Sequence, residues 1–501
     1  MENLLFGIPT VALSLALLLW CYRAYGQRRY ALALFLLLLS GLLLRLFTAA
    51  DGYLHAWDER YHALVARNLL DNPFTPMLYK TPLLDYDYRE WSKNHIWLHK
   101  QPAPLYAMAL SLLLFGKNVL ALRLPSILLS TAGVFFTQRI GQQLFGRRVG
   151  FLAAFLFAIN GLIVEMTAGR VPTDHIDVFF LSFITAAVYF ALRFAATGQR
   201  MFNLLCGLAT GLAILTKWLP ALIVVPLWWM ALRHYGRFNG RETIRKAAVL
   251  LAVIAAVAIP WQVYIWYRFP LEAAWEYRYN ARHIFEVLEG NGGPFYFYLD
   301  RMRIVFGELI YLPVLWLVYV VFHKKDNLKY ALLLTWIAVP FLFFTLIRTK
   351  MQGYVLFTAP AFFILTAVFF VYGWTYCNRF HYKRLAALVL LLLFLLPLRY
   401  AVERIKPFSV RPRTADWMAA ARQLDRSTPN AKKVLFNTRY PVETMFFTDL
   451  TAYETIPDAD RLKALYAEGY TIFIDDGAAI PADVKGLDFV RLVQIGGPVG
   501  H

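Results

Sequence analysis

Two adjacent carboxylates, Asp58 and Glu59, are the strongest candidates for acid–base chemistry in this sequence. They stand in the segment HAWDERYHALVARNLL, where apolar residues recur at helical spacing, so we expect an amphipathic helix that lies on a membrane surface. Neighbouring side chains on a helix point in different directions. One carboxylate is therefore expected to react, while the other caps or supports the helix. The alternative is a solvated helix start, because acidic residues favour first turns.

A second segment, IWLHKQPAPLY, places His99 and Lys100 directly before a helix that begins with prolines. Proline is tolerated in the first turn of a helix but ends a preceding one. A lysine at such a start, at the membrane surface, can meet a lipid phosphate. The alternative is a lysine whose ammonium group only reaches into interfacial water.

The third candidate is the segment GRVPTDHIDVFF, which carries Arg170, Asp174 and Asp177 at the start of an apolar stretch. Two aspartates three residues apart share one helix face. Ionisable residues at the end of a membrane span are common, so a structural role is the alternative. The predicted topology puts this segment on the same side of the membrane as Asp58, and this convergence favours function.

A further group of cations falls in turns that the topology places on that same side. The group consists of Lys217, Arg278, Arg282, His283, Arg348 and Lys350. Each alone is more simply a solvated side chain. Together with nearby carboxylates they indicate a site that binds a phosphorylated lipid and performs acid–base chemistry beside it.

The elements that must position these residues are membrane helices. Hydrophobic residues make up 59% of the 501 residues and charged residues only 17%, and apolar stretches recur at the length that crosses a bilayer. Only helices satisfy their own backbone groups there, so the predicted fold class is an α-helical polytopic membrane protein. The predicted spans are about 4–22, 30–48, 119–140, 150–168, 175–195, 202–216, 218–233, 247–267, 303–322, 328–347, 353–373 and 384–400.

The net charge of +19 comes from basic clusters in short loops, such as Arg147 and Arg148. This is the positive-inside pattern, and it argues against nucleic acid as a partner. The outer loops are then about 49–118 and 268–302. Within the first, residues 104–116 are apolar but too short to span, so we expect an interfacial or re-entrant helix.

A change of composition near residue 403 predicts two domains, a transmembrane domain over 1–402 and a soluble one over 403–501. Short strands at 433–438 and 470–476 alternate with charged helical stretches, which is typical of a small α/β domain.

In the order and spacing of these segments, residues 30–400 resemble the GT-C glycosyltransferases of the protein O-mannosyltransferase and lipid A aminoarabinose transferase type. The resemblance rests on WDERYHALVARNL, the His-Lys-x-Pro loop, the Arg170 to Asp174 stretch, GLAILTKWLP, GPFYFYLDRM and TKMQGYVLFTAPA. It implies Asp58, Glu59 and Asp174 as catalytic residues. It implies donor phosphate binding by Lys100, Arg170, Lys217, Arg348 and Lys350, and substrate binding by His99, Asp177, Arg278, Arg282, His283 and Tyr354.

The implied reaction moves a single sugar from a polyprenyl-phosphate carrier to a lipid, glycan or protein acceptor, with inversion, on the extracytoplasmic face of the cell (inner) membrane. The sequence departs from the family in two ways. An extra apolar segment precedes the span that leads to Asp58, and Asp174 and Asp177 are both candidates for one role. The family uses divalent cations unevenly, and the histidines of the first outer loop show no metal spacing, so the cofactor stays open. A transporter or flippase is the alternative function, although a transporter predicts an internal repeat and none is seen.

Overall fold

The computed structural model describes residues 2–172, 174–324, 327–379 and 381–495. By packing, the chain forms two compact units. Unit 1 contains residues 1–49, 100–104 and 126–410, and unit 2 contains residues 50–99, 105–125 and 411–501. This grouping differs from the division predicted from composition, because most of the first outer loop packs with the C-terminal residues.

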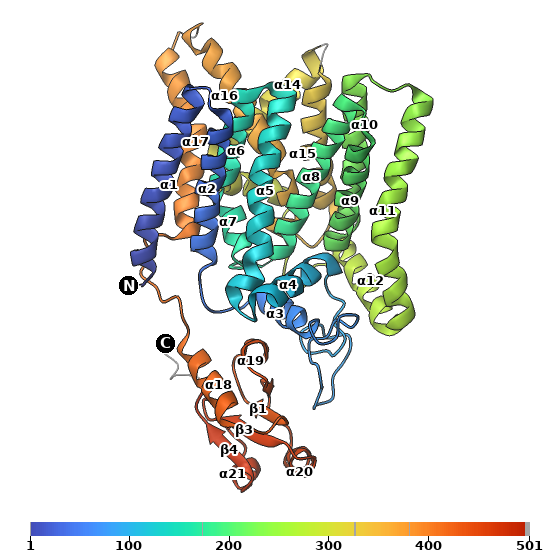
Figure 1. Ribbon diagram of the computed structural model, residues 1–501, viewed down its shortest axis with the longest axis vertical. Coiled ribbons are helices and arrows are strands. Elements are labelled where there is room, and N and C mark those ends of the chain that lie inside the picture. The colour runs from blue at the N-terminus through green and yellow to red at the C-terminus, as the bar shows by residue number, and fades with distance from the viewer. Residues whose placement is uncertain (1, 173, 325–326, 380, 496–501) are drawn as a thin grey trace. The chain divides into compact units, whose positions relative to one another are not determined.

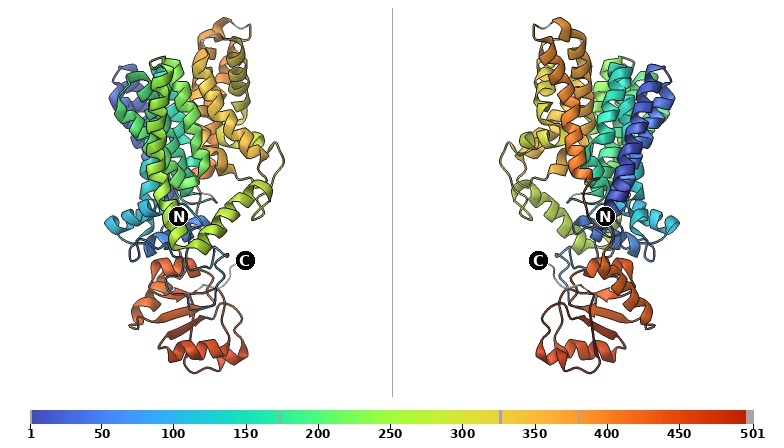
Figure 2. Two further views of the ribbon diagram at one scale, coloured as in Figure 1. Left: turned by 90° about the vertical axis from the view of Figure 1, so that its right-hand side faces the viewer. Right: turned by 90° about the vertical axis from the view of Figure 1, so that its left-hand side faces the viewer.

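Unit 1 is a bundle of long helices, seen from three sides in Figures 1 and 2. Its helices are α1 (Glu2–Gly26), α2 (Tyr30–Ala49), most of α5 (Val119–Phe145), α6 (Arg147–Ile159), α7 (Gly161–Thr167), α8 (His175–Thr197), α9 (Arg200–Lys217), α10 (Val224–Tyr235), α11 (Gly240–Arg268), α12 (Pro270–Phe285), α13 (Phe297–Phe306), α14 (Tyr311–His323), α15 (Leu328–Leu346), α16 (Ala359–Tyr376) and α17 (Lys383–Ile405). Short 3-10 turns, η1 (Leu219–Ile223), η2 (Glu308–Ile310), η3 (Gln352–Thr358) and η4 (Cys377–Arg379), connect some of them.

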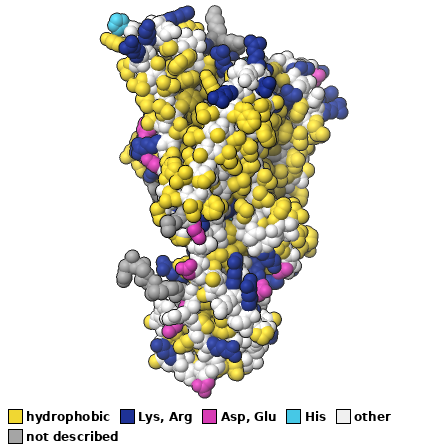
Figure 3. Space-filling view, turned by 60° about the vertical axis from the view of Figure 1, so that its left-hand side comes forward, with side chains coloured by type: hydrophobic (Ala, Val, Ile, Leu, Met, Phe, Trp, Pro, Cys, Tyr) yellow, Lys and Arg dark blue, Asp and Glu magenta, His cyan; other side chains and the backbone are white. Residues whose placement is uncertain are grey.

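The protein is a multi-pass membrane protein. Among the described residues, eight helices are long and apolar enough to cross a bilayer, and the number is ten if each of two bent helix pairs is one span. The two remaining predicted spans correspond to α9 and to η1 with α10. Every predicted span therefore falls on helix. Figure 3 shows the hydrophobic side chains over the bundle and the Lys and Arg side chains gathered at one end of it.

Two predicted spans are broken rather than straight. Helices α6 and α7 meet at 52° because Asn160 adopts an extended backbone and its side chain accepts a hydrogen bond from the backbone N–H of Ile163, which starts a new helix. Helices α13 and α14 meet at 118° at Gly307, whose φ of +93° favours glycine. The predicted span over 303–322 therefore falls on two helices that meet at Gly307.

Unit 2 contains α3 (Asp58–Asn68), most of α4 (Pro102–Phe115) and a small α/β fold. The four strands are all parallel in the order β2-β1-β3-β4. They are β1 (Lys433–Phe436), β2 (Thr451–Ala452), β3 (Thr471–Asp475) and β4 (Val490–Val493), accompanied by α18 (Asp416–Ser427), α19 (Pro441–Phe447), α20 (Ala459–Ala467) and α21 (Ala482–Lys485). Both predicted strands are confirmed, whereas β2, β4, α19 and α21 were not foreseen.

Helices α3 and α4 depart from expectation to different degrees. The 14 residues of α4 agree with the predicted short apolar helix. Helix α3 begins at Asp58 as predicted, but it is buried on nearly every face rather than along one stripe, and even Glu59 and His62 have no exposed surface. A helix lying on a membrane would keep a wet polar face, so α3 is instead a packed element of unit 2.

Candidate functional site

The second carboxylate of the acidic pair, Glu59, is held by a buried arginine in unit 2. Arg123 donates from Nε to Glu59 Oε1 at 2.6 Å and from Nη2 to Oε2 at 2.9 Å, and neither side chain is exposed. The backbone N–H of His55 donates to the same carboxylate at 2.7 Å. Such a two-pronged arginine contact fixes the orientation of a carboxylate as well as its charge. Glu59 therefore anchors the first turn of α3.

Asp58 occupies the first position of α3, where the helix dipole favours a negative charge. Its side chain is partly exposed, in contrast to Glu59. The segment before it is tied down as well, since Asp51 accepts from Arg411 at 3.0 Å and lies 3.7 Å from Arg413. The polypeptide that carries Asp58 is thus fixed at both ends within unit 2.

The loop that closes the first outer region ends in stacked aromatic rings. His99 packs flat on Trp91 with ring centres 4.5 Å apart, and edge-on to Trp97 at 5.8 Å. Its neighbour Lys100 belongs to unit 1 and precedes α4. Within unit 1 the next residue, Gln101, accepts a hydrogen bond from Gln262 of α11 at 2.8 Å, which holds this stretch against that helix.

In unit 1 the end of α9 meets the start of α8. The ammonium of Lys217 contacts the carboxylate of Asp177 and lies 4.7 Å from the centre of the Tyr354 ring. Asp177 sits in the first turn of α8 and Lys217 in the last turn of α9, so each charge lies at the helix end whose dipole favours it. Asp177 is 2% exposed and Lys217 20%.

The residue after Lys217 has an unusual backbone. Trp218 has a φ of +66°, which a large L-residue rarely adopts, and its indole packs against Tyr277 of α12 at 4.7 Å. Such conformations persist only where the surrounding structure enforces them, and they concentrate at functional sites. This turn therefore sets the position of Lys217.

The other residues of the third segment are buried at the same helix start. Asp174 is the N-terminal cap residue of α8 and has no exposed surface, and the next residue, His175, contacts Ser126 Oγ through Nδ1 at 2.8 Å. Arg170 donates to the carbonyl oxygens of Thr48 at 2.8 Å and Ile405 at 3.2 Å, near the ends of α2 and α17. The guanidinium of Arg170 thus satisfies helix-end carbonyls.

Lys350 also faces carbonyl oxygens. Its ammonium donates at 2.7 Å to the carbonyls of Thr345 and of Ile347, at the end of α15, and its side chain is buried. Burial and the neighbouring charge of Arg348 lower the pKa of Lys350 from its usual value. In this arrangement Lys350 completes the C-terminal turn of α15, and Arg348 is the exposed cation of the turn.

Of the candidates on α12, Arg278 and Arg282 are exposed and His283 is half-buried. Arg282 pairs with Glu286 at 2.7 Å, and His283 contacts the carbonyl of Tyr279 at 3.1 Å. Arg278 contacts the carbonyl of Ala274 at 3.3 Å, one helical turn back. These contacts are local, and an exposed pair of this kind adds little stability.

Within unit 1 the structure therefore brings together Asp177, Lys217 and Tyr354, while Arg170 and Lys350 face helix ends instead. The predicted convergence of Asp58 with the lysines joins residues of two units, and it stays a prediction. Sequence reasoning missed Arg123. The available signal was an arginine inside the apolar run VLALRLPSILL, since a charged residue in such a run has a structural or functional partner. Among the described residues, no group of three or more His, Cys, Asp or Glu side chains could hold a metal ion.

Comparison with known proteins supports the fold and the resemblance. Residues 99–266 match the family described as dolichyl-phosphate-mannose-protein mannosyltransferase. An undecaprenyl phosphate-alpha-4-amino-4-deoxy-L-arabinose arabinosyl transferase of Pseudomonas fluorescens is 27% identical over 273 residues, which cover 52% of this chain and 46% of that protein. A Pseudomonas aeruginosa protein of the same name is 26% identical over 53% of this chain and 49% of its own length. The chain thus spans about half the length of the curated relatives it matches.

Solved structures extend the likeness to most of the chain. ArnT from Cupriavidus metallidurans, bound to undecaprenyl phosphate, superposes with a TM-score of 0.60 at 16% identity and covers 86% of this chain and 87% of ArnT. The oligosaccharyltransferase AglB from Archaeoglobus fulgidus gives a TM-score of 0.56 at 13% identity and covers 83% of this chain and 64% of AglB. The chain has the fold of the GT-C glycosyltransferases, and its sequence resembles their protein mannosyltransferase and aminoarabinose transferase members.

Proposed function

We propose that this protein is an inverting glycosyltransferase that moves one sugar from a polyprenyl-phosphate carrier to an acceptor. The observation that carries the proposal is that the matched segment, residues 99–266, contains the ion pair between the buried Asp177 at the start of α8 and the half-buried Lys217 at the end of α9. The family match thus includes the part of unit 1 where Asp177, in the first turn of α8, holds the ammonium of Lys217 in place. The named relatives act on undecaprenyl-phosphate sugars, and this supports a carrier of that class.

In the proposed reaction the oxygen of an acceptor hydroxyl attacks the anomeric carbon as the bond from that carbon to the carrier phosphate breaks. The attack comes from the face opposite the phosphate, so the configuration inverts. The carboxylate of Asp58 takes the hydroxyl proton. The leaving phosphate gains negative charge, which Lys217, Lys100 and Arg348 stabilise.

The buried contacts in unit 2 support the choice of Asp58 over Glu59 as the base. Both oxygens of Glu59 are occupied by Arg123, whereas Asp58 is partly exposed on the same first turn. We assign Glu59 and Arg123 the task of holding that turn in place. A base has to be positioned within hydrogen-bond reach of the proton it accepts.

We also propose that the protein lies in the inner membrane with this chemistry on the extracytoplasmic side. The basic loop clusters support that orientation, because positive charge favours the cytoplasmic side. The test is cysteine labelling at position 95 of the otherwise cysteine-free protein. An impermeant maleimide should label it from the outside, and labelling from the cytoplasmic side alone would overturn the orientation.

The decisive experiment compares Asp58→Asn with the unchanged protein, using an undecaprenyl-phosphate-linked sugar and acceptor extracts. Loss of general-base catalysis should reduce turnover by about 100-fold to 10 000-fold. Asp71→Asn is the matched control, because Asp71 is an exposed carboxylate of the same unit that pairs with Lys80 at 2.7 Å. Undiminished turnover by Asp58→Asn would sink the assignment. Passage of intact donor across the membrane, without cleavage of its sugar–phosphate bond, would favour a flippase.

A further inference from the structure

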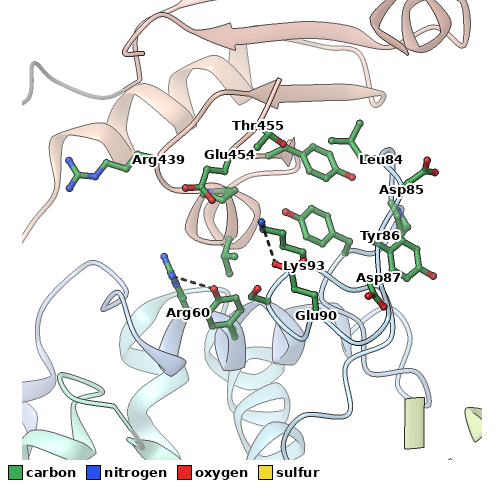
Figure 4. A pocket seen from close by; sticks show the side chains of 17 residues that line it. Arg60, Leu84, Asp85, Tyr86, Asp87, Glu90, Lys93, Arg439, Glu454 and Thr455 are labelled. Carbon is green, nitrogen blue, oxygen red and sulfur yellow. Dashed lines mark hydrogen bonds and ion pairs between the residues drawn. The ribbon is translucent and has the colours of Figure 1, made fainter. Parts of the chain in front are cut away.

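Unit 2 contains a cavity of about 270 Å³ that the proposed transfer reaction does not use. Its walls are α3, the loop around residues 79–93, and the segment 439–455 of the C-terminal α/β fold, as Figure 4 shows. The volume is near the lower bound for small-molecule pockets, roughly 300 Å³. This size suits a short polar ligand rather than an extended lipid or peptide.

One wall of the cavity is a fixed aromatic surface. The rings of Tyr79 and Tyr453 stack at 4.9 Å with only 13° between their planes. Both hydroxyls are held, since Tyr79 donates to the Ala452 carbonyl at 3.1 Å and Tyr453 accepts from the Leu83 N–H at 2.7 Å. A third lining ring, that of Tyr86, is 43% exposed. The stacked pair keeps this wall rigid, and Tyr86 offers an accessible ring face.

The polar groups of the cavity are nearly balanced in charge, with four carboxylates and three basic side chains in its lining. Two of the basic groups are paired: Arg60 with Glu443 at 3.4 Å and Lys93 with Glu90 at 3.4 Å. In the described part of the chain, no ion pair involves Glu454. Among the residues drawn in Figure 4, dashed lines mark the hydrogen bond from Arg60 to the Tyr61 hydroxyl and the Lys93–Glu90 ion pair, and none ends at Glu454.

These features together describe carbohydrate recognition. Aromatic faces pack against the C–H-rich faces of sugar rings, and planar charged groups such as carboxylates form paired hydrogen bonds with neighbouring hydroxyls. A cavity for a polyanion, such as a phosphorylated headgroup, would instead carry an excess of basic groups. The near balance of charge therefore selects against phosphate.

We propose that this cavity binds a neutral or amino-substituted saccharide, which is the glycan part of the acceptor. Only the identification of the saccharide as part of the acceptor rests on the proposed function, because saccharide binding itself needs no transfer reaction. The accessible ring of Tyr86 and the carboxylate of Glu454 carry the contacts.

The test is binding of the labelled full-length protein, in nanodiscs, to an array of defined neutral, amino-substituted and phosphorylated oligosaccharides. The unchanged protein should bind one or more neutral or amino-substituted glycans. Tyr86→Ala and Glu454→Gln should each weaken that binding about tenfold, the effect of losing one well-placed contact. Tyr466→Ala is the matched control, because Tyr466 is 54% exposed on α20 of the same unit and does not line the cavity.

Three outcomes would overturn the inference: no glycan bound above background, preference for phosphorylated glycans, or binding that survives both cavity substitutions. The array contains no lipid-linked donor. If the protein turns over the donor but binds no glycan on the array, only the saccharide site is refuted. If it binds glycans but shows no turnover in any acceptor extract, the proposed transferase function is refuted and the saccharide site stands.

Discussion

Replacing Arg123 by methionine should loosen the whole first turn of α3. The substitution removes the cation that faces Glu59 and leaves the carboxylate buried at 0% exposure. Breaking one partner of a buried ion pair costs about 3–5 kcal/mol. Arg123 also donates to the carbonyls of Asp51 at 2.8 Å and Tyr53 at 2.9 Å, and these lost hydrogen bonds act in the same direction.

Hydrogen exchange of the full-length protein measures this effect locally. A loss of about 3 kcal/mol or more in the free energy of opening corresponds to roughly a hundredfold faster amide exchange in α3. The readout is the peptide covering residues 51–68, followed by mass spectrometry in nanodiscs. Arg282→Met is the matched control, since it removes an arginine whose ion pair with Glu286 is exposed, and exchange in α12 should change little.

The double variant Glu59→Gln with Arg123→Met separates charge from packing. It removes both charges together, so exchange should return part of the way to that of the unchanged protein. If Arg123→Met leaves α3 as protected as before, or if the double variant exchanges as fast as Arg123→Met alone, the buried pair does not hold the turn and our reasoning is refuted.

Three further predictions concern other parts of the chain. A Cβ at Gly150 would lie 2.4 Å from the Gln138 carbonyl oxygen, so Gly150→Leu should abolish monodisperse protein in size-exclusion chromatography, whereas Gly26→Leu, with no atom within 4 Å, should not. Burial raises the pKa of Glu443 despite Arg60, so the folded state keeps a proton that the unfolded state releases, and thermal stability should fall as the pH rises from the usual pKa of a glutamate through the raised pKa. Glu443→Gln should flatten that decline. A variant with the same pH profile as the unchanged protein would contradict this prediction. Lys217→Met should lower kcat/KM for the lipid-linked donor about a hundredfold. The double variant Lys217→Met with Asp177→Asn should regain stability but not activity. Recovery of activity in the double variant would show that Lys217 only neutralises Asp177.

Hydropathy and charge in the sequence predicted most of the local elements, although not β2, β4, α19 or α21. Apolar stretches of bilayer length placed helix at every predicted span, and short apolar runs between charged helical stretches placed β1 and β3, because both patterns depend only on residues close in the chain. The breaks at Asn160 and Gly307 were missed, since a single capping side chain or a single left-handed glycine ends a helix without changing its average hydropathy.

The partners of the candidate site residues were decided only by the tertiary structure. Glu59 and Arg123 are 64 positions apart, and Asp177 and Lys217 are 40 apart, so no local pattern relates them. The ammonium of Lys350 donates to helix-end carbonyls, a contact that no local pattern predicted, and its role at the donor phosphate stays a prediction. The sequence by itself determined a membrane helix bundle with acidic and basic residues at its loops, because the length and composition of each apolar stretch decide whether it enters the bilayer. The pairing of charged side chains depends on how helices that are distant in the chain pack against one another, and this packing is established only in the folded structure.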